Sequence, residues 1–151
     1  MRKLPVKILA LILGGAVVIA GVAYAYWTVT GSGTGQAGTG TTSAITVNQT
    51  STVSGLAPGT PAQALSGTFD NSNSGSVYVT SVSATVTGTD KAGCSASDYT
   101  VTGSPASVGA QIASGSGVGT WSGISIAFNN KPSTNQDACK GATVSISYTS
   151  N

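Results

Sequence analysis

The stretch VYVTSVSATV, Val77 to Val86, is the longest apparent β-strand of the chain, and it follows the turn-forming sequence FDNSNSGS, Phe69 to Ser76. It mixes β-branched and aromatic residues with Ser and Thr in an alternating order. A period of two predicts a strand with one buried face and one face in water. The side chains expected to share one face are those of Tyr78, Thr80, Val82, Ala84 and Val86.

Other short alternating segments surround this strand, and turn-rich sequences such as SGLAPGTPAQ, Ser54 to Gln63, separate them. These segments lie at Ala44–Val47, Leu65–Phe69, Tyr99–Val101, Val108–Ile112, Ile124–Phe128 and Ala142–Tyr148. No long amphipathic helical pattern follows Trp27. Seven or eight short strands with turns between them predict an all-β fold. We expect residues 43–151 to form a single antiparallel β-sandwich, of jelly-roll or immunoglobulin-like type.

The N-terminus carries the uncharged stretch ILALILGGAVVIAGVAYAYW, residues 8–27, after Arg2, Lys3 and Lys7. Twenty such residues form a helix about 30 Å long, enough to cross a bilayer. The flanking cations predict that the rest of the chain is exported. We expect an N-terminal hydrophobic helix in residues 1–25, acting as a signal peptide or as a transmembrane anchor.

The two roles differ at Ala23-Tyr24-Ala25, a pattern of small residues that signal peptidases cut. Cleavage between Ala25 and Tyr26 releases the protein outside the cell. The apolar run is longer than an ordinary signal core, which favours retention in the membrane through residues 8–27. Residues 26–42 are rich in Gly and Thr and are expected to be a flexible spacer.

Charged residues make up only 7% of the 151-residue chain, which has no His and no Glu. After Trp27 there are three lysines and four aspartates, for a net charge of −1. The basic character therefore comes from the N-terminus alone. A domain without a basic face is not expected to bind nucleic acid.

Two cysteines, Cys94 and Cys139, lie 45 positions apart in a chain expected to be exported. An even count in an oxidising compartment predicts a disulfide. Closing a loop of this size stabilises a fold by about 4 kcal/mol in the chain-entropy model. Both cysteines lie in polar, loop-like sequence, so the bond should join two loops at one end of the sandwich. Two Cys without His do not make a zinc site.

The sequence offers no convincing catalytic or metal-binding group, and we expect no enzyme and no cofactor. His, the commonest general base, is absent. A Ser–Lys pair from Lys91, Lys131 or Lys140 is conceivable, and Asp90 and Asp98 are interpreted as solvated loop residues. The segment DNSNSG, residues 70–75, is interpreted as a hairpin turn, because a calcium loop needs Glu where position 81 is Ser.

Three features together resemble the TasA/camelysin family of secreted bacterial matrix-fibre proteins. They are the export end GGAVVIAGVAYAYW (Gly14 to Trp27), the polar stretch up to Gly40-Thr41, and SGLAPGTPAQALSGTFDNSNSGSVYVTSV (Ser54 to Val82). The resemblance implies a jelly-roll sandwich, a dedicated signal peptidase and no catalysis. It also implies fibres in which the N-terminal segment of one subunit, here Tyr26 to Thr42, completes the sheet of the next. The matching turn is Leu56 to Gly59.

We therefore expect an exported structural or interaction protein of the cell surface or extracellular matrix, which associates with itself or with another surface protein. The alternative is a membrane-anchored binding module for a carbohydrate or a surface protein. That alternative needs an aromatic platform, for which Tyr78, Tyr99, Trp121, Phe128 and Tyr148 are available. A pilin is less suitable, because no acidic residue begins the apolar helix.

Overall fold

The computed structural model describes residues 30–151. The expected hydrophobic helix and the Ala25–Tyr26 cleavage site lie outside the described residues. The chain divides into two units, Met1–Thr39 and Gly40–Asn151. Residues 30–39 are exposed and have no regular secondary structure. Between residues 30 and 151, no helix has the length and apolar character needed to cross a membrane.

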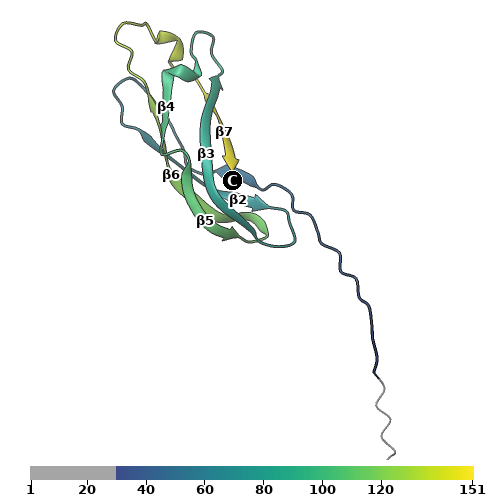
Figure 1. Cartoon of the computed structure of the whole chain (residues 1–151). Helices are drawn as coiled ribbons and strands as arrows, with labels where there is room; N and C mark the ends of the chain where they lie inside the picture. The colour runs from purple at the N-terminus through teal and green to yellow at the C-terminus, as the bar shows by residue number, and fades with distance from the viewer. Residues whose placement is uncertain (1–29) are drawn as a thin grey trace, which may run out of the picture. The chain divides into compact units, whose positions relative to one another are not determined.

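The second unit contains seven strands in two antiparallel sheets (Figure 1), which confirms the all-β prediction. The strands are β1 (Thr46–Gln49), β2 (Gln63–Asn71), β3 (Val77–Thr89), β4 (Tyr99–Thr102), β5 (Ala106–Ile112), β6 (Gly115–Phe128) and β7 (Val144–Ser150). One sheet has four strands in the order β1-β2-β6-β4, and the other has three in the order β5-β3-β7. Two short 3₁₀ helices, η1 (Ala96–Asp98) and η2 (Asp137–Cys139), complete the secondary structure.

From β2 onward the chain changes sheet at every connection. In an immunoglobulin constant domain the first, second, fifth and fourth strands share one sheet. Here β6 takes the place of the fifth strand, and β5 joins the other sheet. The strand order therefore differs from the immunoglobulin order, although the sandwich-like arrangement of two sheets is the same.

Both sheets contribute apolar side chains to one core, as the alternating sequence requires. The residues that are at most 2% exposed within it are Leu65, Phe69, Val79, Val82, Ile112, Trp121, Ile124 and Ile126. Trp121 also donates its indole N–H to the carbonyl oxygen of Asn48 at 3.1 Å. This bond ties the edge strand β1 to β6 across β2, and it satisfies the polar atom of a buried ring.

The predicted face of β3 is wrong in its first part. The backbone N–H groups of Thr80 and Ser81 both donate to the carbonyl oxygen of Asn151, which marks a β-bulge in β3. A bulge adds one unpaired residue and so exchanges the two faces of a strand. Val79 and Val82 are consequently both buried, while Tyr78 points outward and is 56% exposed.

The first half of β6 was missed because its pattern has a period of three. Successive β2 residues Leu65, Gly67, Phe69 and Asn71 pair with Ile124, Trp121, Val118 and Gly115. Seven residues of β2 thus face ten of β6, with one β-bulge in each interval. Each interval of β6 holds one glycine with a positive φ, at Gly117, Gly119 and Gly123. Glycine adopts these angles without the steric cost that other residues incur.

Two ends of the sandwich can be distinguished by what joins their loops. We call the asparagine end the one formed by the β2–β3 turn (72–76) and the β5–β6 turn (113–114). Asn71, which is 1% exposed, donates its side-chain amide to the carbonyl oxygens of Gly75, Ile112 and Ala113. It therefore links both turns. Its own oxygen accepts from Asn73.

Candidate functional site

The opposite end, which we call the disulfide end, is formed by the β3–β4 loop (90–98) and the β6–β7 loop (129–143). Cys94 and Cys139 form a disulfide between these loops, with an S–S distance of 2.01 Å. Both cysteines are buried. The two short 3₁₀ helices lie at this end (Figure 1). The covalent bond fixes the positions of two long connections that otherwise have no strand pairing.

Asp98 is the centre of a buried polar network beside the disulfide. Its carboxylate accepts hydrogen bonds from the Lys131 ammonium at 2.8 Å, from the Gln136 amide at 3.0 Å and from the Ser95 backbone N–H at 2.9 Å. The side chain of Asp98 is only 9% exposed. The Lys131 hydrogen bond, followed by those of Ser95 and Gln136, holds the pKa of the Asp98 carboxyl well below its usual range.

Asp98 is buried, so the prediction from the sequence that it is a solvated loop residue is wrong. Asp98 lies four positions after Cys94, and Gln136 lies three positions before Cys139. The disulfide brings these neighbours together across the two loops. Closeness in sequence to each cysteine was the signal that could have found the network. Lys131, which reaches it from the far end of its loop, carries no such signal.

The other charges of the disulfide end are distributed over its rim. Lys140 pairs with Asp137 at 2.6 Å, and both side chains are largely exposed. Asp90 accepts the backbone N–H of Thr143 at 2.7 Å. The Lys91 ammonium donates to the carbonyl oxygen of Lys140 at 2.6 Å. All three lysines of residues 30–151 therefore lie at this end, and Asp70 is the single charged residue at the asparagine end.

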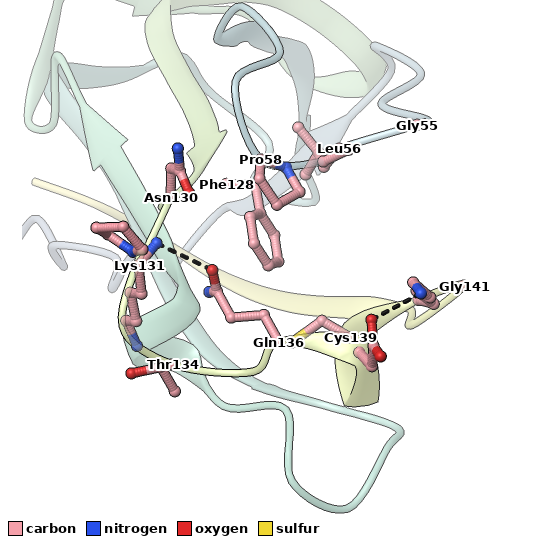
Figure 2. A pocket seen from close by; sticks show the side chains of 14 residues that line it. Gly55, Leu56, Pro58, Phe128, Asn130, Lys131, Thr134, Gln136, Cys139 and Gly141 are labelled. Atoms are coloured by element: carbon pink, nitrogen blue, oxygen red, sulfur yellow. Dashed lines mark hydrogen bonds and ion pairs between the residues drawn. The ribbon is translucent and has the colours of Figure 1, made fainter.

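A pocket of about 500 Å³ opens at the disulfide end between the β1–β2 loop and the β6–β7 loop. Figure 2 shows Leu56 and Pro58 on one side of it and Gln136 and Cys139 on the other, with Phe128 between them. This volume is typical of sites for small ligands or for single anchoring side chains. Its lining includes the exposed pair of Lys140 and Asp137 and two exposed neutral polar residues, Asn130 and Thr134. Neither Asn130 nor Thr134 makes a side-chain hydrogen bond within residues 30–151.

A second hollow of about 320 Å³ shares Leu56 and Cys139 with this pocket. It continues between the segment that follows β1 and the edge strand β7, where Val144 and Ile146 line it. Tyr99 closes its inner wall, and burial raises the pKa of this tyrosine. Together the two hollows form a depression along one side of the disulfide end, with both apolar and polar residues in its lining.

The residues considered for catalysis are each engaged in other contacts. Lys131 lies 3.3 Å from the Ser97 hydroxyl, but its ammonium also forms the ion pair with Asp98. A Ser–Lys mechanism needs a neutral amine that accepts the serine proton. The Lys131 nitrogen is instead engaged with the Asp98 carboxylate at 2.8 Å. Asp90 and Asp98 are held by separate partners, Thr143 for the first and Lys131 for the second.

One cluster of potential metal ligands occurs in the described part of the chain. The ligand atoms of Cys94, Asp98 and Cys139 lie within 4.8 Å of one another. Metal ions bind cysteine as the thiolate, and both sulfurs here belong to the disulfide. In the 70–75 segment, Asp70 instead accepts from Ser116 and Gly117, and Asn71 points into the interior. These side chains do not converge on one point.

No family model matches the chain, and searches against curated proteins and solved structures found no match. The resemblance to the TasA/camelysin family therefore remains a hypothesis based on sequence.

Proposed function

We propose that this protein is an exported, non-catalytic structural protein of the cell surface or extracellular matrix that assembles with copies of itself by β-strand pairing. One observation carries the proposal. The three-stranded sheet has two seven-residue edge strands, β5 and β7, and neither contains a charged residue or a proline. Soluble proteins usually protect such edges with Lys, Pro or very short strands. In the four-stranded sheet, β1 and β4 have only four residues each.

The segment that donates the additional strand is, on this proposal, the Gly/Thr-rich region 26–42 of a neighbouring copy. Residues 30–42 are exposed, and their backbone groups have no partners in regular secondary structure. The TasA/camelysin resemblance implies the same arrangement and a jelly-roll relationship. Ordering so many glycines is entropically costly. The backbone hydrogen bonds of the paired strand must therefore offset this loss of conformational entropy.

Export rests on residues 8–27 and on the disulfide, which is typical of proteins in oxidising compartments. Either cleavage after Ala25 or retention as an anchor brings the sandwich outside the cell. Intact mass of the material outside the cell distinguishes the two. A mass beginning at Tyr26 supports cleavage, and membrane-bound protein that retains Met1 supports anchoring.

Replacing Gly33, Gly35 and Gly38 together by Pro tests strand donation, because proline removes the backbone N–H groups that a donated strand needs. The matched control replaces the same three glycines by Ala, which keeps these N–H groups. We expect electron microscopy to show filaments for the native and Ala chains and none for the Pro chain. Filaments of native length from the Pro chain contradict the proposal.

A second candidate function is supported by the 500 Å³ pocket, which combines apolar walls with the neutral polar groups of Asn130 and Thr134 and with the exposed Lys140–Asp137 pair. Such a site suits a sugar or a side chain of a surface protein. In that case the protein is a binding module. Replacing Asn130 and Thr134 by Ala should then weaken binding to an array of neutral glycans, with the Thr85→Ala variant as a control on the outer face of β3.

A further inference from the structure

Tyr78 is the only large hydrophobic side chain of residues 30–151 that is exposed. The bulge at Thr80 and Ser81 leaves Tyr78 on the outer face of the three-stranded sheet, close to the asparagine end. Its hydroxyl lies over Gly109 of β5. A Cβ atom built on Gly109 would be 3.7 Å from the hydroxyl oxygen. The hydroxyl makes no hydrogen bond within the described part of the chain. An aromatic ring with this exposure and a polar tip is a common anchor at protein interfaces.

The 500 Å³ pocket lies at the other end of the sandwich and is lined by Leu56, Pro58 and Phe128. Its shape is set by the disulfide and by the Asp98 network, so it is organised before anything binds. It exceeds the size of a tyrosine ring. The unpaired side chains of Asn130 and Thr134 at its rim suit a phenolic hydroxyl, which both donates and accepts.

The distribution of charge favours contact between unlike ends. Two asparagine ends facing each other bring Asp70 toward a second Asp70. An asparagine end facing a disulfide end avoids this repulsion, because the three lysines of that end are balanced by its three aspartates, Asp90, Asp98 and Asp137. Lys91 has no carboxylate partner among residues 30–151, whereas Lys131 and Lys140 each pair with an aspartate.

We infer that Tyr78 of one copy occupies the pocket of the next copy, head to tail. Because ring and pocket lie at opposite ends, each contact leaves one free ring and one free pocket, and the interface is of the kind that grows into an open filament. The inference rests on the proposed self-assembly. To the proposed strand donation, the Tyr78 contact adds an interaction between folded domains that does not use the spacer.

The test uses the full chain with Gly33, Gly35 and Gly38 replaced by Pro, so that strand donation cannot contribute. In sedimentation velocity over a concentration series, we expect this parent chain to associate reversibly into short oligomers, without the filaments that strand donation produces. Adding Tyr78→Ala should weaken the association by about 30-fold, the loss typical of an interface anchor. The matched control, Thr85→Ala on the outer face of the same strand, should leave it unchanged.

Mixing two variants tests the head-to-tail geometry. In the same parent chain, Tyr78→Ala keeps the pocket but removes the ring, and Thr134→Trp fills the pocket but keeps the ring. At a concentration where the parent chain associates but a contact weakened about 30-fold does not form, each variant alone should be monomeric, and the mixture should stop at a one-to-one dimer. Near-ultraviolet circular dichroism confirms that both variants are folded.

A monomeric parent chain, an unchanged association of Tyr78→Ala, or a mixture that stays monomeric would each overturn the inference. These outcomes leave strand donation standing if the native chain forms filaments that the Pro substitutions abolish. Conversely, filaments from the Pro parent that Tyr78→Ala dissolves overturn strand donation and support the Tyr78 contact.

Discussion

The two ends of the sandwich solve the same problem with different chemistry. Each must hold together two connections that cross between the sheets. The disulfide end uses a covalent bond and the buried ion pair between Lys131 and Asp98. The asparagine end uses one buried neutral amide, Asn71, which bonds to three carbonyl groups.

The difference follows from the lengths of the connections. The turns at the asparagine end are short, so a single side chain spans them and satisfies their carbonyl groups. The loops at the disulfide end are longer and cost more conformational entropy to order. A covalent bond lowers this cost by restricting the unfolded chain. The charges gather where the loops are long, because loops carry the polar residues that the strand faces lack.

The largest effect should come from removing the disulfide. The double variant Cys94→Ala/Cys139→Ala is expected to lose about 4 kcal/mol of unfolding free energy. The unfolded chain regains the freedom of the 45-residue separation. Urea denaturation monitored by Trp fluorescence measures this. Reduction of the native protein with dithiothreitol should give a similar midpoint, and a double variant as stable as the native protein would show that the loops hold themselves.

The next effect should come from the asparagine end. Asn71→Leu leaves the carbonyl groups of Gly75, Ile112 and Ala113 without their donor, at an expected cost of about 2–3 kcal/mol. Asn73→Ala is the control in the same turn and should cost about 1 kcal/mol. The same urea experiment compares the two. Equal losses in both variants would contradict the central role of Asn71.

The pH dependence of stability should reveal the contribution of Asp98 at the disulfide end. The lowered pKa of Asp98 means that the unfolded state binds its proton more readily than the folded state. Its contribution is therefore complete above about pH 4, the unfolded value, and is lost as the pH falls below it. Asp98→Asn should cost about 1–2 kcal/mol at pH 7 and flatten the acid limb of the stability curve. An acid limb with the native slope in Asp98→Asn would exclude this carboxylate as its source.

The smallest effect should come from the exposed pair of Lys140 and Asp137, whose side chains are 79% and 67% exposed. Water and salt screen such a pair, and ordering two side chains offsets its attraction. Lys140→Ala should leave the urea midpoint unchanged at physiological salt. A clear loss of stability would mean that the rim of the disulfide end is more rigid than its exposure indicates.

Sequence periodicity predicted the architecture because most strands have one buried and one wet face. β2 and β7 follow this rule. The disulfide was also predictable, because the sequence has only two cysteines. The rule failed where bulges change the period, in the first half of β6 and next to Tyr78 in β3. Bulges depend on pairing with a distant strand, so a local pattern does not reveal them. β1 begins at Thr46, two residues later than Ala44, where its strand was expected.

The site was harder to foresee than the fold. The pocket and the Asp98 network are made by loops that meet only after both sheets have formed. Lys131 and Asp98 are 33 residues apart and share no pattern. The disulfide hinted at their proximity, but the direction of each side chain depends on the path of the loops.

The unequal strand lengths of β2 and β6 have a mechanical consequence. Ten residues of β6 cover the same distance as seven of β2. A strand extends by about 3.3 Å per residue, so β6 holds roughly 10 Å of slack in its three glycine bulges. When tension is applied along the sandwich, β2 becomes taut first, and β6 can lengthen before its peptide chain is loaded.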